Sequence, residues 1–186
     1  MCIRAVSRWP VLRRVLVQIL FWLLTSATFI QVSAEEVHIR AATLACETAQ
    51  GALQAKDYQA AAEHFRQAIE IEPTYLAARQ GLIKTYLASG QESKAASEMT
   101  QLLEIEPDAS AYRLQLGQIL LREKQFDRAL AQFSLARKTD RRNAEALLGF
   151  ATAAEQAGMH DRATAALAEG RTLFPSDERF VTSQKK

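Results

Sequence analysis

Residues 57–73 read DYQAAAEHFRQAIEIEP, and this stretch decides the fold. Within it, Tyr58, Ala61 and Phe65 are spaced three or four residues apart, which places them on one stripe of an α-helix. Pro73 ends that helix, because proline has no backbone N–H group to donate to the preceding turn. Small and large apolar residues alternate along the stripe. The stretch therefore predicts a helix whose apolar face packs closely against a second helix.

The same pattern recurs every 34 residues along the chain. The equivalent positions are Ala61, Ala95, Ala129 and Ala163, then Phe65, Met99, Phe133 and Leu167, with Pro73, Pro107 and Pro175 at the ends of their units. Two amphipathic helices cannot bury their apolar faces within one hairpin, so neighbouring units must stack. The repeat therefore predicts an all-α chain of stacked helical hairpins.

The repeat resembles the tetratricopeptide repeat (TPR) family, whose unit has this length. That family carries Leu-Gly…Tyr in the first helix of each unit and Ala-x-x-x-Phe-x-x-Ala…Pro in the second. Leu116-Gly117, and Leu82 with Tyr86, match the first pattern, and Ala61, Phe65, Ala68 and Pro73 match the second. The resemblance implies a right-handed superhelical solenoid of about four helix-turn-helix units, at 42–75, 76–109, 110–143 and 144–177. These units form a repeat domain at 35–177, followed by a C-terminal tail at 178–186.

The register also predicts the individual helices and turns. We expect helices near 37–55, 59–71, 75–89, 92–105, 109–123, 126–138, 143–157 and 160–173. Gly90 and Gly158 fall in tight turns, and Lys56 and Lys124 stand in the other two turns.

The third and fourth units depart from the repeat. Arg141 occupies the place of a proline in the third unit, where Asn143 is the expected cap of the next helix. The fourth unit has Gly170 where an alanine is expected, which predicts looser packing of the last hairpin.

The first 34 residues differ from the rest in composition. Their only charges are four arginines, which precede an apolar run over 15–30 and the small residues Ser33 and Ala34. This order predicts a signal peptide at 1–34, cleaved after Ala34, and a periplasmic or secreted protein. The alternative is an N-terminal membrane anchor, since residues 15–34 approach the ~20 residues that span a bilayer. In that case the protein contacts the membrane only through residues 11–34.

Charge and cysteine content exclude several classes of protein. The whole chain has a net charge of +2, but residues 35–186 include 19 basic and 21 acidic residues. No basic excess remains to indicate nucleic-acid binding. Cys2 lies in the predicted signal, which leaves only Cys46. One thiol supports neither a disulfide framework nor a zinc site, so we expect Cys46 to be a core residue.

The sequence predicts no enzyme and no catalytic, cofactor-binding or metal-binding residues. His38, His64 and His160 are far apart in the sequence and match no paired ligand spacing. We expect His64 to be a solvated helix residue and His160 to fill an aromatic packing position. The glycines do not cluster into a phosphate-binding loop.

In the family that the chain resembles, the first helix of each unit lines a concave groove that receives a partner's peptide. The corresponding positions predict a peptide-binding groove formed by Gln50, Leu53, Gln80, Lys84, Leu87, Leu114, Gln118, Leu121, Arg122, Leu148 and Thr152, with Cys46, Gln54 and Glu155 beside them. Leucines and amides with Lys84 and Arg122 as lone cations suit a peptide with apolar anchors. Family members that grip an acidic carboxyl terminus use Lys and Asn at set positions. Cys46, Gln50 and Gly81 stand at such positions here, which excludes that mode.

Together these features predict a non-enzymatic interaction module. It is an exported scaffold or adaptor that binds a protein or peptide partner in its groove, within a cell-envelope assembly, and it binds no nucleic acid. The alternative is a structural spacer or a self-associating repeat protein without a dedicated groove.

Overall fold

The computed structural model describes residues 36–182, and all regular secondary structure in that part of the chain is helical. The helices are 36–54, α2 (Tyr58–Ile71), α3 (Leu76–Ala88), α4 (Glu92–Ile105), α5 (Ser110–Arg122), α6 (Phe126–Thr139), α7 (Ala144–Gln156), α8 (His160–Leu173) and α9 (Arg179–Thr182). All eight helices predicted from the repeat are present, each within one residue of its predicted ends. The all-α prediction is confirmed.

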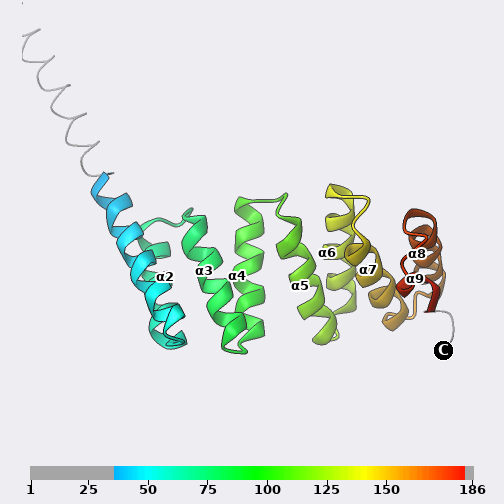
Figure 1. Ribbon diagram of the computed structural model, residues 1–186, viewed down its shortest axis with the longest axis horizontal. Helices are drawn as coiled ribbons and strands as arrows, with labels where there is room; N and C mark the ends of the chain where they lie inside the picture. Colours follow the sequence, from blue (N-terminus) through cyan, green and yellow to red (C-terminus); the bar gives the residue numbers. More distant parts are fainter. Residues whose placement is uncertain (1–35, 183–186) are drawn as a thin grey trace, which may run out of the picture.

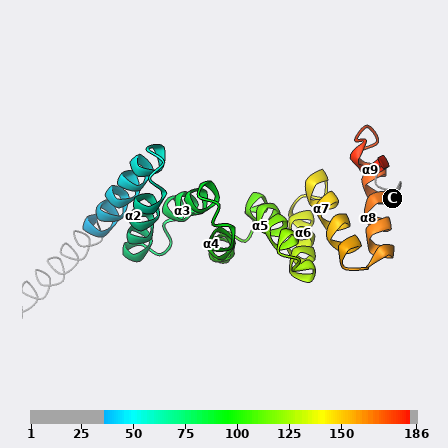
Figure 2. The same cartoon turned by 90° about the horizontal axis from the view of Figure 1, so that it is seen from below.

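The helices follow one another in chain order along the longest axis of the molecule (Figures 1 and 2). From α2 onward each helix packs against the next, and α5 also packs against α7, the first helix of the following hairpin. Because contacts run between neighbours in sequence, the buried core is a continuous layer that extends through the stack.

One tight turn connects the two helices of each hairpin, and the four turns have equivalent geometry. Gly90 and Gly158 have φ of +73° and +76°, and Lys56 and Lys124 have φ of +60° and +59°. In every case the N–H of the following residue donates to a carbonyl five residues earlier, as from Gln91 to Tyr86 at 2.8 Å. This is the hydrogen bond that ends a helix with one left-handed residue. The predicted turn positions are confirmed, including the two lysines that replace glycine.

Glycines on first helices make room for aromatic rings from second helices. A Cβ at Gly81 would lie 2.3 Å from the ring of Phe65, so only glycine fits there. Phe133 is received in the same way by Gly117 and Gly149, where an added Cβ would come within 2.8 and 2.4 Å of its ring. Both rings are buried, as predicted, and they close the junctions between helices.

The last hairpin is closely packed, so the prediction of looser packing around Gly170 is wrong. Phe180 of α9 is fully buried, and a Cβ on Gly170 would lie 2.1 Å from its ring. The ring of Phe180 also stacks on Phe174, with centroids 5.6 Å apart. The space that the missing alanine leaves is filled by a residue that follows the repeats.

The third unit ends its second helix without proline. Asp140 leaves the helix in an extended conformation at φ −136° and ψ 102°. Asn143 then starts α7, where its Oδ1 accepts a hydrogen bond from the Ala146 N–H at 2.9 Å. The predicted cap is confirmed, and it explains how Arg141 is accommodated.

Between residues 36 and 182, no helix is long and apolar enough to span a membrane. The predicted signal or anchor at 1–34 and its cleavage position lie outside the described residues.

Candidate functional site

The predicted groove residues lie on the first helices of the hairpins, at helical spacing. On α3, for example, Gln80, Lys84 and Leu87 are four and three residues apart, so they share one face. The exposed members of the set are Gln50, Lys84, Gln118, Arg122 and Thr152, and the half-buried ones are Leu53, Gln80, Leu87, Leu114, Leu121 and Leu148. The leucines pack against the core with one side and leave the other side accessible. This face therefore offers apolar edges between polar side chains.

The two cations of this face have different surroundings. Arg122 forms a two-pronged ion pair with Glu92 at the start of α4, with N–O distances of 2.9 and 3.0 Å. Arg122 therefore has a partner outside the groove lining, Glu92 on a second helix. Both side chains are about half exposed, at 56% and 44%, and such pairs contribute little stability. Within residues 36–182, Lys84 has no hydrogen bond or ion pair from its side chain.

Cys46 is a core residue, as predicted. Its side chain is buried, and burial raises the pKa of the thiol above its usual value. Gln50 donates to the thiol, from Nε2 to Sγ at 3.7 Å. Cys46 is therefore inaccessible to a peptide, although it occupies a first-helix position.

Three polar side chains near the predicted groove, those of Gln54, Glu155 and His160, are exposed. Glu155 lies 3.3 Å from Nδ1 of His160. His160 is 70% exposed, so the prediction that it fills an aromatic packing position is wrong. It is the first residue of α8, directly after the hairpin turn. His64 is half-buried on α2.

In the part of the chain that the structure describes, no three His, Cys, Asp or Glu side chains cluster closely enough to hold a metal ion.

In two of the units, an arginine on the first helix contacts the second helix of the same unit. The sequence patterns did not predict this contact. Arg79 is buried and donates to Glu98 Oε2 at 2.7 Å, to Gln101 at 2.8 Å and to the carbonyl of Pro73 at 3.3 Å. One repeat later, Arg113 donates to the Pro107 carbonyl and to Gln132. The spacing of 34 residues between the two arginines was the signal that could have revealed this contact. Because it recurs with the fold, we assign it to packing and not to ligand binding.

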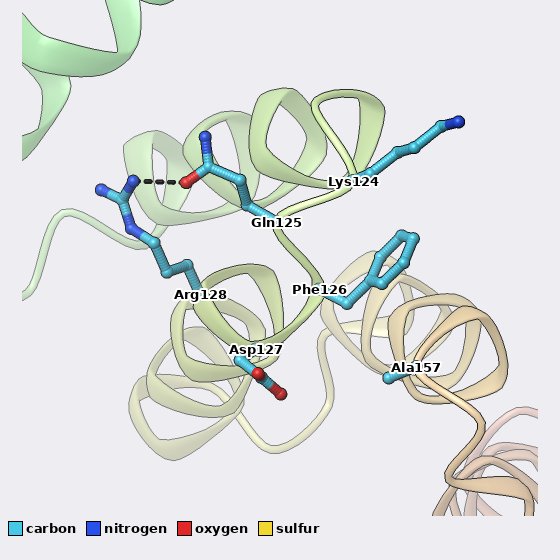
Figure 3. Close-up of a pocket in the computed structure, with 6 residues that line it drawn as sticks. All are labelled: Lys124, Gln125, Phe126, Asp127, Arg128 and Ala157. Atoms are coloured by element: carbon cyan, nitrogen blue, oxygen red, sulfur yellow. Dashed lines mark hydrogen bonds between the residues drawn. The ribbon is translucent and has the colours of Figure 1, made fainter.

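A pocket of 360 Å³ lies at the turn between α5 and α6. Figure 3 shows Arg128 donating a hydrogen bond to Gln125 at this turn, with Phe126 beside Ala157 of the next unit. None of the predicted groove residues lines it. Its charges are mixed and no nucleophile is paired with a base, so it offers no constellation for catalysis.

A second cleft, of 490 Å³, lies between α6, α7 and α8. We call it the basic cleft, because Arg137, Lys138, Arg141 and Arg162 line it together with Phe150 and Glu169. Sequence patterns did not predict it, although Arg141 in the place of a proline was one visible sign. The other sign is Lys138, which stands where the first two units have Glu70 and Glu104.

Comparison with known proteins finds a matching family over most of the chain. The family model described as "Tetratricopeptide repeat" matches residues 52–119 and 120–185. No curated protein sequence matches the chain.

Solved structures are similar in fold. A crystal structure of MamA protein has a TM-score of 0.66 at 16% identity, covering 75% of this chain and 76% of that chain. MamA from Desulfovibrio magneticus RS-1, from residue 41 to its end, has a TM-score of 0.63 at 16% identity, with coverage of 75% and 79%. A tetratricopeptide repeat protein from Parabacteroides merdae ATCC 43184 has a TM-score of 0.61 at 16% identity, with coverage of 75% and 54%. At these identities the similarity concerns the fold alone.

Proposed function

We propose that this chain, which belongs to the tetratricopeptide repeat family, is a non-enzymatic scaffold or adaptor that binds a peptide segment of a partner protein. The binding surface is the predicted groove face of the first helices. The observation that carries the proposal is the repeated pairing of half-buried leucines with exposed polar side chains, as in Leu114, Gln118 and Leu121 on α5.

The chemistry of this face suits a peptide. Partly accessible leucines provide apolar surface that a side chain of the ligand can cover, which is favourable by about 25 cal/mol per Å² removed from water. Glutamine and threonine side chains can both donate to and accept from an extended backbone. Lys84 and Arg122 are its only charged members, and depletion of charge is typical of the centre of a protein interface.

The Arg122–Glu92 pair leaves room for ligand binding. Because both partners are exposed, exchanging Glu92 for an acceptor on the ligand costs little. Lys84 has no ion pair to give up in the described part of the chain, and so it is the cation that we expect to contact the ligand first.

The groove proposal is tested by combining Lys84→Glu with Leu121→Ser. Immobilised wild-type chain should capture a partner from a cell-envelope extract. The double variant should capture at most about one tenth of that amount, because it loses a cation and an apolar anchor. Circular dichroism should show unchanged helicity, since Lys84 is exposed and Leu121 is half-buried.

The matched control makes the same two changes on second helices, with Lys94→Glu on α4 and Leu135→Ser on α6. Both side chains are exposed there. Full capture by the control with loss in the groove variant supports the proposal. Full capture by both variants contradicts it.

Export is the second part of the proposal, with the protein acting in a cell-envelope assembly and residues 1–34 directing it there. The four arginines, the apolar run and the small residues before Glu35 support it. Amino-terminal sequencing of the protein from the envelope should find Glu35 as its first residue. An intact first segment in the membrane fraction would favour the anchor, and recovery of the protein from the cytoplasm alone would refute export.

One observation favours the alternative of a self-associating repeat protein. Val37, Ile39 and Leu44 on the first described helix are 66%, 53% and 64% exposed, which leaves apolar surface at this end of the stack. Light scattering distinguishes the two functions. A mass that grows with concentration supports self-association, and a constant monomer mass rules it out.

A further inference from the structure

We propose that the basic cleft between α6, α7 and α8 binds the carboxylates of an acidic segment of a partner protein, as a second site independent of the groove. Neither the repeat pattern nor the family requires positive charge at this place.

The other unit junctions show that packing does not need these cations. The positions of Arg137, Lys138 and Arg141 in the third unit correspond to Leu103, Glu104 and Pro107 in the second and to Ile69, Glu70 and Pro73 in the first. The hairpins stack at those junctions with an apolar, an acidic and a proline residue in these places. The cations are therefore a chemical feature of one junction and not a requirement of the fold.

Two of the arginines are held in place before any ligand arrives. The guanidinium carbons of Arg137 and Arg162 each lie 5.2 Å from the ring centroid of Phe150, within the range of cation–π attraction. Arg137 also donates to Glu169 at 2.5 Å and is only 24% exposed. Fixing these side chains in the free protein lowers the entropy that binding must remove.

The cleft has an excess of positive charge. Arg137, Lys138, Arg141 and Arg162 face a single carboxylate, that of Glu169. Glu169 already pairs with Arg137, whereas Lys138 and Arg141 form no side-chain hydrogen bond or ion pair within residues 36–182. Guanidinium groups match the geometry of carboxylates, and several cations together favour a ligand with several carboxylates over one with a single charge.

The basic cleft and the groove lie on different sides of the same helix. Phe150 is two residues from both Leu148 and Thr152, which corresponds to a rotation of about 200° around α7 at 3.6 residues per turn. Occupation of the cleft therefore leaves the groove residues free, and one chain can hold two segments at once.

The test measures binding of a fluorescent hexaglutamate peptide, blocked at both ends, to the full chain in a mild detergent. The variant combines Lys138→Glu with Arg141→Pro, which restores the residues found in the second unit. Asp140 has the extended conformation that a following proline favours, so this variant should fold. We expect wild-type binding to weaken with salt, and the variant to bind at least about tenfold more weakly because two cations are lost and an anion is gained.

Controls separate this site from the groove and from other anions. Lys84→Glu should leave hexaglutamate affinity unchanged, so the groove proposal can fail without affecting this one. Lys138→Glu alone should show an intermediate loss and serves if the double variant does not fold. Equal affinity of wild type and variant overturns the proposal. Inorganic phosphate or hexathymidylate binding as tightly as the peptide also overturns it, since the cleft would then accept a different anion.

Discussion

At the scale of single residues, the fit between glycine and phenylalanine sets the spacing of the helices. Phe65 and Phe133 could be predicted as packing residues because they recur at one position of the repeat. The need for glycine opposite each ring could not be predicted, because it depends on how closely two helices approach. The same holds for the Arg122–Glu92 pair, whose members are 30 residues apart. The basic cleft could be predicted only in part, from Arg141 and Lys138.

A pair of glycine substitutions tests this fit. Gly149→Ala would place a Cβ 2.4 Å from the Phe133 ring, and we expect it to lower the free energy of unfolding by about 1–3 kcal/mol through overpacking. Gly51→Ala is the matched control, since nothing lies within 4 Å of the added atom. Alanine favours the helix there, so this change should raise stability by up to ~1 kcal/mol. Urea unfolding measures both, and equal effects of the two changes would contradict the assigned contact.

At the scale of helices, most of the structure could be predicted from the sequence. Helix ends agree within one residue because stripes, caps and turns are local features, as Asn143 and Gly158 illustrate. The exception is α9. Phe180 lies after the last repeat, and no periodicity indicates that its ring returns to Gly170. The predicted looseness of the last hairpin failed for this reason.

Phe180→Ala tests whether α9 closes the end of the stack. Removing a fully buried ring should lower the free energy of unfolding by about 3–5 kcal/mol. Unfolding of this variant should begin at α8, because Gly170 and Phe174 contact the ring. Arg179→Ala is the control, since the Arg179 side chain is 56% exposed and loss of its ion pair with Asp177 should leave thermal unfolding unchanged. A Phe180 variant as stable as wild type would show that α9 does not close the stack.

At the scale of the whole molecule, the stack separates two kinds of surface. First helices carry the predicted groove face, which is nearly uncharged, and the junction of the last two units carries the basic cleft on the other side of α7. The repeat specifies the first surface, because its positions recur from unit to unit. The second arises where one unit departs from the repeat, so it becomes apparent only when equivalent positions are compared in the folded chain.

The central claim is that a partner peptide lies along the first helices. Replacing Gln118 on α5 with the photocrosslinking residue benzoylphenylalanine tests it most directly, because Gln118 is exposed and lies on the groove face. The matched position is Thr100 on α4, which is exposed on a second helix. On illumination in a cell-envelope extract, we predict a covalent adduct with the partner from position 118 and none from position 100. An adduct from position 100 with none from position 118 would contradict the claim.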